Sequence, residues 1–127
     1  MYKFLTGSLT VERLTIAISD LPASLKGTKL VQLSDFHYEG WGLSSQLLSE
    51  AIATSNAIQP DLVLLTGDYV TYESTSIHAL INQLQHLNSK AGIYAILGNH
   101  DIKPYGAREE ITDALTSIGI QVLWNQI

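Results

Sequence analysis

Three short polar clusters in this sequence combine residue types that bind divalent cations. They are Asp35-Phe36-His37, Gly67-Asp68 and Gly98-Asn99-His100-Asp101. Carboxylate, imidazole and amide side chains suit Mn, Fe, Zn or Mg rather than a metal that prefers thiolates. Each cluster alone also fits an ordinary turn or helix start. Their occurrence together, at similar spacing along the chain, is what predicts a metal site.

The spacing within the clusters predicts how the side chains share metal ions. Alternate residues of an extended chain point the same way, so we expect Asp35 and His37 to reach one ion. Asp68 has two carboxylate oxygens and can bridge two ions. Gly67 and Gly98 have no side chain, which lets the backbone turn sharply beside these ligands.

Each cluster directly follows an apolar run that has the length of a buried strand. We expect strands at residues 14–18, 30–33, 62–65, 93–97 and 120–124. The first of these alternates apolar and polar residues, which predicts a strand with one buried face.

Three segments with helical spacing separate the later strands. The first helix is expected to be capped by Ser44 or Ser45. The last is expected to carry Glu109 and Glu110 in its first turn and to end at Gly119. The expected buried faces are Leu47, Leu48, Ala51 and Ile52, then Ile77, Leu80, Ile81, Leu84 and Leu87, then Ile111, Ala114, Leu115 and Ile118.

Alternating strands and helices predict an α/β fold with a mainly parallel sheet built from β-α-β units. Strands that are apolar on both sides predict a sheet covered on both faces. In a parallel sheet the carboxyl ends of the strands share one edge, where ligands bind. The three polar clusters are therefore expected to converge at that edge.

The composition describes an acidic globular chain of 127 residues with a net charge of −5 and no cysteine. Nucleic-acid binding depends on Lys and Arg neutralising phosphates, so we expect no nucleic-acid-binding patch. Disulfides and thiolate metal sites are excluded. No apolar run has the length of a transmembrane helix, and the first five residues are too short for a signal peptide. We expect a cytoplasmic protein, unless a targeting segment has been lost upstream.

The three clusters resemble the first three motifs of the calcineurin-like metallophosphoesterase family, which are Asp-x-His, Gly-Asp and Gly-Asn-His-Asp or Glu. The resemblance extends from Lys29 to Asn125. Residues 29–37 are similar to a bacterial branch that includes membrane-associated and lipid-precursor phosphoesterases. The resemblance implies the first half of an α-β-β-α sandwich, and hydrolysis of phosphate mono- or diesters at a site with two divalent metal ions.

The resemblance also implies a role for each residue of the clusters. Asp35 and His37 would bind the first metal, Asp68 would bridge both metals, and Asn99 would bind the second. His100 would protonate the leaving group of the phosphate-ester substrate. Asp101 would orient His100.

The family pattern continues beyond these motifs with an isolated His and a Gly-His-x-His cluster, which this sequence lacks. Residues 1–127 are therefore expected to be a partial domain, completed by a C-terminal half or by self-association through an uncovered sheet face. The alternative is a truncated, catalytically inactive fragment that only binds metal or a partner. The remaining histidines, His78 and His86, fall on the solvent side of their helix and are expected to be surface residues.

Other side chains near the clusters could contact the substrate, but they could equally be packing residues or solvated surface residues. Aromatic residues just past the strands could line a substrate rim or simply pack, and two basic residues could meet a phosphate or be solvated. The aromatic residues are Tyr38, Trp41, Tyr69, Tyr72 and Tyr105, and the basic residues are Lys103 and Arg108. A nucleotide-binding α/β domain is disfavoured because no glycine-rich phosphate loop follows any strand.

Overall fold

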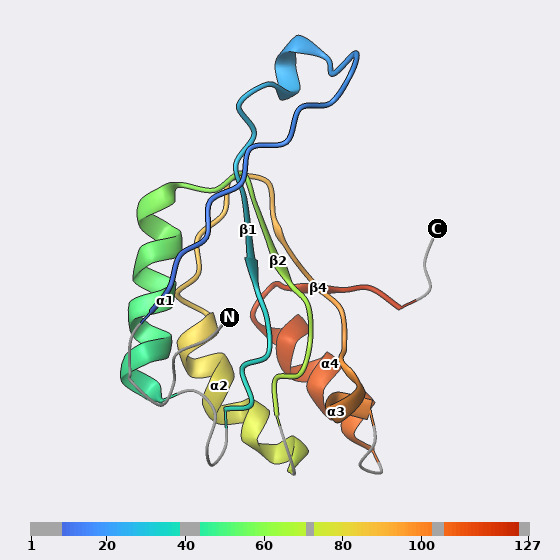
Figure 1. Cartoon of the computed structure of the whole chain (residues 1–127). Helices are drawn as coiled ribbons and strands as arrows, with labels where there is room; N and C mark the ends of the chain where they lie inside the picture. Colours follow the sequence, from blue (N-terminus) through green and yellow to red (C-terminus); the bar gives the residue numbers. More distant parts are fainter. Residues whose placement is uncertain (1–8, 39–43, 71–72, 103–105, 125–127) are drawn as a thin grey trace.

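The computed structural model of the chain is built on one parallel sheet (Figure 1). It describes residues 9–38, 44–70, 73–102 and 106–124. The strands are β1 (Leu30–Leu33), β2 (Leu62–Leu65), β3 (Ile93–Ala95) and β4 (Gln121–Val122), each parallel to the next in this order. The predicted α/β class, with a parallel sheet and β-α-β units, is confirmed.

The three long helices begin and end with the signals seen in the sequence. They are α1 (Ser45–Ile58), α2 (Ile77–Leu84) and α4 (Ala107–Ser117). The Ser44 side chain caps α1 by accepting the Leu47 N–H at 3.1 Å. Gly119 follows the end of α4 with a φ of 87°, a left-handed conformation that glycine adopts without a steric penalty.

The helices cover one face of the sheet. Parallel partners in the register share a face, and the face that carries Val63, Leu65 and Ala95 is buried against the apolar stripes of the helices. Leu48, Ile77, Leu80 and Leu115 are among the fully buried helix residues. The predicted apolar stripes therefore form the core.

The apolar strands alone predicted a sheet covered on both faces, and the partial-domain interpretation predicted one uncovered face; in the described residues the helices cover one face only. Leu30 and Ile96, on the opposite face, are 56% and 45% exposed. The strand order explains this result, because it runs β1-β2-β3-β4 without reversing. Crossovers of one handedness that all move in one direction place their helices on the same side.

The predicted strand at residues 14–18 is also absent. This segment belongs to residues 9–29 (blue, Figure 1), which run upward past α1 in this view and then loop beyond the amino ends of the strands, where they form the 3₁₀ turn η1 (Ala23–Leu25). Leu14 and Ile16 are 85% and 70% exposed. An alternating pattern describes a strand that is half buried on a sheet, and no described strand pairs with this segment.

The described strands at the end of the sheet are shorter than their apolar runs. The predicted strand 93–97 ends at Ala95, and the predicted strand 120–124 contains only Gln121–Val122. A four-residue helix, α3 (Asn99–Ile102), follows β3 and was not expected. None of the helices in the described ranges is long and apolar enough to cross a bilayer.

A polar link joins α4 to the start of α2. The Glu110 carboxylate accepts the Ser74 hydroxyl at 2.5 Å and lies 2.8 Å from Nε2 of His78. Ser74 belongs to the 3₁₀ turn η2 (Ser74–Ser76) that precedes α2. The hydrogen bond from Ser74, followed by that from His78, lowers the pKa of Glu110 below its ordinary value.

This link predicts a pH-dependent contribution to stability. A carboxyl group whose pKa is lower in the folded than in the unfolded chain stabilises the fold above its unfolded pKa, and the contribution is lost as the pH falls through the folded pKa. We expect Glu110→Gln to lower the free energy of unfolding by less than about 1 kcal/mol at pH 6, since the group is partly exposed. Urea denaturation followed by circular dichroism measures this difference.

The matched control is Glu109→Gln, which removes the same charge from the exposed neighbouring position of α4. We expect the stability difference between the two variants to disappear as the pH falls through the lowered pKa of Glu110, because its carboxyl group is then protonated. A difference that grew towards low pH would contradict the role given to Glu110.

Candidate metal centre

The segments that follow β1 and β2 stay hydrogen-bonded to each other beyond the ends of both strands. The Thr66 N–H donates to the Leu33 carbonyl, and the Asp35 N–H donates to the Gly67 carbonyl, both at 3.0 Å. The His37 N–H donates to the Asp68 carbonyl at 2.9 Å. The backbone thus continues the parallel pairing and places the first two polar clusters side by side.

The three acidic and imidazole residues of these clusters share an unusual backbone conformation. Asp35, His37 and Asp68 have φ values of 56°, 40° and 55°. The expected mechanism for Asp35 and His37, alternation along an extended chain, is therefore wrong, because β1 ends at Leu33 and both residues are left-handed. Asp and His are among the non-glycine residues that adopt this region most often, and its cost is characteristic of functional sites.

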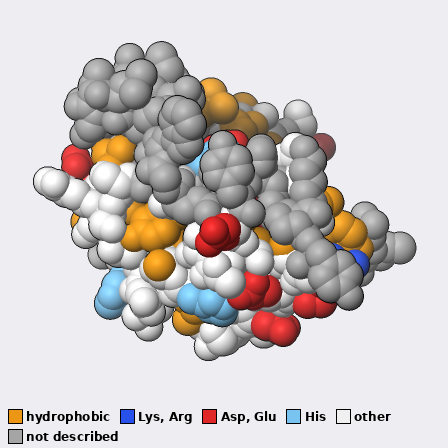
Figure 2. Space-filling view, turned by 90° about the horizontal axis from the view of Figure 1, so that it is seen from below, with side chains coloured by type: hydrophobic (Ala, Val, Ile, Leu, Met, Phe, Trp, Pro, Cys, Tyr) orange, Lys and Arg blue, Asp and Glu red, His pale blue; other side chains and the backbone are white. Residues whose placement is uncertain are grey.

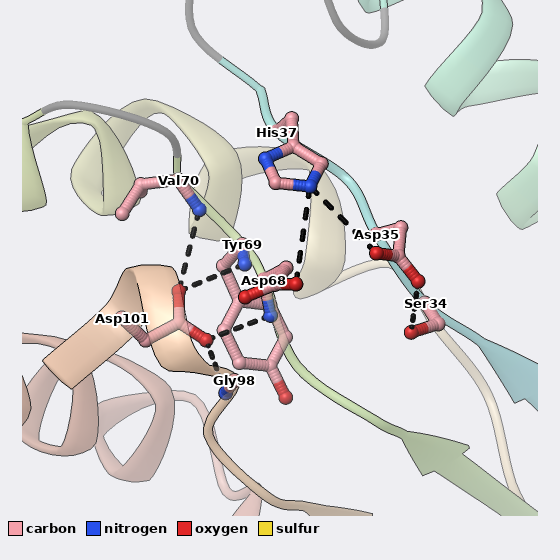
Figure 3. Close-up of polar contacts among 8 residues, drawn as sticks. All are labelled: Ser34, Asp35, His37, Asp68, Tyr69, Val70, Gly98 and Asp101. Carbon is pink, nitrogen blue, oxygen red and sulfur yellow. Dashed lines mark hydrogen bonds and ion pairs between the residues drawn. The ribbon is translucent and has the colours of Figure 1, made fainter.

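The side chains of Asp35, His37 and Asp68 converge on one point (Figure 3). Nε2 of His37 lies 3.7 Å from Oδ1 of Asp35 and 3.9 Å from Oδ2 of Asp68. One ligand atom from each residue lies within 4.8 Å of the other two. Ligands bonded at about 2.0–2.2 Å lie roughly 3.0–3.5 Å apart around a common ion, so closing on a cation needs only a small inward movement.

The donor set and its accessibility fit a hard or borderline divalent cation. The side chains of Asp35, His37 and Asp68 are 65%, 27% and 19% exposed, so the group opens to solvent on the Asp35 side. The Ser34 hydroxyl donates to the second Asp35 oxygen at 2.8 Å and orients that carboxylate. Ser34 was not among the predicted site residues, and its position next to Asp35 is the signal in the sequence that points to it.

Two glycines let the second and third clusters approach each other. A Cβ on Gly67 would lie 2.5 Å from the backbone nitrogen of Gly98. A Cβ on Gly98 would lie 2.2 Å from Oδ1 and 2.5 Å from the backbone nitrogen of Asp68. The two loops are in contact at these positions, so glycine is required for close approach of the loops as well as for the expected turns.

The third cluster lies in α3, next to the Asp68 loop. Asn99 begins the helix one residue after Gly98, and its side chain is exposed. The backbone of His100 lies in α3, while its side chain falls outside the described part of the structure. Asp101 is fully buried, and its carboxylate accepts N–H groups from Gly98, Asp68 and Tyr69.

Tyr69 is a buried packing residue next to Asp68 and does not line a surface that could contact the substrate. It is fully buried, its ring stacks on Phe36 at 5.6 Å between centroids, and its hydroxyl lies 2.8 Å and 3.1 Å from the carbonyls of Ile96 and Leu65. Burial raises the pKa of this phenol well above its ordinary value. The structure therefore supports a packing role for this tyrosine rather than a role in substrate contact.

Among the described residues, two further candidate side chains make contacts with residues outside the three-residue group. The Tyr38 hydroxyl lies 2.7 Å from the Ser45 hydroxyl, and the Arg108 guanidinium stacks 4.2 Å above the ring of Trp124. His78 and His86 are exposed, as predicted. Trp41, Tyr72, Tyr105 and Lys103 lie outside the described residues.

The end of the molecule that carries the site is acidic among the side chains shown in colour. Figure 2 views this end and shows acidic side chains and histidines at the surface, with basic side chains confined to the margin. Carboxylate side chains gathered near a site attract cations. The geometry and the charge together favour binding of a divalent cation by Asp35, His37 and Asp68.

Comparison with known proteins connects this arrangement to a family. A sequence model described as calcineurin-like phosphoesterase matches residues 28–125. The phosphodiesterase YaeI of Escherichia coli (strain K12) is 40% identical over 101 residues, which are 77% of this chain and 37% of that protein. The uncharacterized metallophosphoesterase YkuE of Bacillus subtilis (strain 168) is 38% identical over 94 residues, or 72% of this chain and 32% of that protein.

More distant similarities include a pyrophosphatase and a nuclease. The UDP-2,3-diacylglucosamine pyrophosphatase LpxG of Chlamydia muridarum (strain MoPn / Nigg) is 33% identical over 88 residues, covering 68% of this chain and 26% of that protein. The crystal structure of Pseudomonas putida nuclease MPE gives a TM-score of 0.42 at 16% identity, covering 76% of this chain and 50% of that one. The chain thus spans about a third of the length of the curated relatives described here.

The contact between the two loops predicts that Gly98→Ala weakens metal binding. The added methyl group would overlap the backbone nitrogen and the carboxylate of Asp68, so Asp68 would have to move. We expect the dissociation constant for Mn²⁺, measured by isothermal titration calorimetry, to rise by about tenfold or more.

Gly119→Ala is the control, because a Cβ at this position meets nothing within 4 Å and the only penalty is its φ of 87°. This variant should lower stability by about 1–2 kcal/mol without changing Mn²⁺ affinity. Unchanged Mn²⁺ affinity in Gly98→Ala would show that the close approach of the loops does not position Asp68.

Proposed function

The chain belongs to the calcineurin-like phosphoesterase family, and from that premise we propose that it hydrolyses phosphate esters with divalent metal ions bound at Asp35, His37 and Asp68. The observation that carries this proposal is the convergence of three ligand atoms within 4.8 Å at the carboxyl ends of β1 and β2. Family membership implies the metal, and the donor set is of the kind that binds it.

The described residues divide into two sets of ligands. Asp35, His37 and Asp68 would hold a first ion, and Asp68 with Asn99 would contribute to a second. Bound divalent cations act as Lewis acids on phosphoryl oxygens and activate water at neutral pH. The carboxylates contribute negative charge that concentrates cations here, and the Ser34 hydroxyl keeps the Asp35 carboxylate in its orientation.

We assign proton transfer to His100. It lies in α3 between Gly98 and Asp101, both of which contact the Asp68 loop. An imidazole that donates a proton to the leaving oxygen contributes typically about 10²–10⁴ in rate. Asp101 would orient this imidazole, in addition to its contacts with backbone N–H groups.

The substrate class is a phosphate ester. Relatives are described as a phosphodiesterase and as a pyrophosphatase that acts on UDP-2,3-diacylglucosamine, so the family handles different phosphoryl compounds. We propose a monoester or diester for this chain. The exposed position of Asp35 is consistent with a substrate that approaches from solvent.

We propose that further ligands come from a complementing C-terminal half, which makes residues 1–127 the N-terminal part of a larger domain. Two features support this proposal. The relatives are about three times as long as the matched segment, and the sheet has an uncovered apolar face that includes Leu30 and Ile96. The alternative function is a catalytically inactive fragment that binds metal or a partner.

The first experiment tests metal-dependent hydrolysis. Bis-p-nitrophenyl phosphate and p-nitrophenyl phosphate are incubated with the 127-residue chain and Mn²⁺, beside Asp68→Asn and the control Asp113→Asn, which removes an exposed carboxylate from α4. We expect Asp68→Asn to lose Mn²⁺ binding and any turnover, because one carboxylate serves both ligand sets. Equal Mn²⁺ affinity in Asp68→Asn and Asp113→Asn would exclude this site.

The second experiment counts the ions. Since only one of the two ligand sets has three side chains, we expect calorimetry to show about one tightly bound Mn²⁺ per chain and turnover to be weak or absent. Analytical ultracentrifugation with Mn²⁺ reports the oligomeric state at the same time. Two tight ions and robust turnover by a monomer would contradict the need for a complementing half, and the same result from a dimer would assign that role to a second copy.

A further inference from the structure

The buried carboxylate of Asp101 connects two loops through backbone groups. Its Oδ2 accepts the N–H of Asp68 at 2.8 Å and that of Gly98 at 2.7 Å. Its Oδ1 accepts the N–H of Tyr69 at 2.9 Å and lies 3.4 Å from the nitrogen of Val70. Both oxygens of a fully buried carboxylate are therefore engaged by backbone N–H groups (Figure 3).

The donors on the Asp68 side come from three successive residues, Asp68, Tyr69 and Val70. Successive backbone N–H groups around a left-handed residue form a concave anion-binding site. Here the anion is supplied by the protein itself. On the other side, Asp101 reaches back to the N–H of Gly98, which precedes α3, as the third residue of a capping box does.

The Asp68 peptide is fixed on both sides by these contacts. Its N–H donates to Asp101, and its carbonyl accepts the N–H of His37 at 2.9 Å. Between them Asp68 has a φ of 55°, which an unsupported aspartate adopts only at a cost. This conformation aims its carboxylate at His37, where Oδ2 lies 3.9 Å from Nε2.

We propose that Asp101 is a positioning residue of the metal centre, which acts by holding the Asp68 backbone in the left-handed conformation that presents its carboxylate to Asp35 and His37. This inference rests on the proposed function, since it takes the three residues as metal ligands. It differs from the orientation of His100, because it acts on metal affinity through Asp68. One buried carboxylate thereby couples the second and third polar clusters.

Asp101→Asn tests this role. Asparagine keeps the shape but has one oxygen, so its amide nitrogen would face two backbone N–H donors. We expect the Mn²⁺ dissociation constant to rise by about tenfold or more, as for other groups that orient a ligand. In ¹⁵N spectra without metal, the amide signals of Asp68, Tyr69 and Gly98 should move and lose protection from hydrogen exchange. Asp113→Asn, with the same change of charge on an exposed residue, should change neither measurement.

The outcomes separate this role from its alternatives. Mn²⁺ affinity equal to that of the unmodified chain, with lower turnover alone, would overturn the inference and leave Asp101 acting through His100. If Asp101→Asn does not fold, Asp101→Glu replaces it as the test. Glutamate retains two oxygens, so this variant should keep part of the Mn²⁺ affinity of the unmodified chain. A folded Asp101→Glu that does not bind Mn²⁺ counts against the role. Rapid exchange of the Asp68 and Tyr69 amides in the unmodified chain would overturn the inference without any variant.

Failure of the proposed function is recognised separately. If the unmodified chain and Asp113→Asn both fail to bind Mn²⁺, then Asp35, His37 and Asp68 are not metal ligands. In that case Asp101 does not position a metal ligand. The exchange measurement still reports, in that case, whether Asp101 holds the two loops together.

Discussion

The arrangement of this site depends on the parallel pairing of β1 and β2 and on its continuation past the strand ends. Hydrogen bonds from Asp35 to Gly67 and from His37 to Asp68 extend the ladder into segments that are no longer strands. These bonds fix the relative position of two loops that lie far apart in sequence. They also satisfy backbone groups beside the cluster, where an unpaired donor would be costly. The geometry of the candidate metal site is in this sense a product of the sheet register.

The backbone does more of the positioning than the sequence pattern suggested. The helices, four of the five expected strands and the gathering of the polar clusters at one edge follow from periodicity and from the rule that parallel strands share their carboxyl edge. The left-handed conformations of Asp35 and His37 could not be predicted in the same way, because they depend on bonds to the Gly67 loop. The pattern around Leu14 and Ile16 predicted a strand, but the described sheet offers this segment no partner. Local alternation cannot say where a neighbouring strand lies.

Asp101 shows how one buried carboxylate can connect the backbones of two neighbouring loops. Burial raises the pKa of its carboxyl group above the ordinary value, and the surrounding backbone N–H groups act in the opposite direction. The sequence identified this residue as part of a motif, but its backbone partners became visible only in three dimensions. Glycines at positions 67 and 98 make the contact possible, since any side chain there would separate the loops. The buried carboxylate and the two glycines therefore act as one structural unit.

The left-handed backbone at Asp35, His37 and Asp68 has a consequence for redesign of the centre. If these residues bind metal as proposed, a replacement residue would have to coordinate the intended metal and also tolerate this region of conformational space. Glutamate has a suitable carboxylate but lacks the short side chain that helps Asp and Asn adopt the left-handed region. Libraries intended to change metal preference would therefore gain more from Asp, Asn and His combinations than from the wider set of coordinating residues. At these positions the backbone torsion angle excludes more residue types than the requirement to coordinate a metal does.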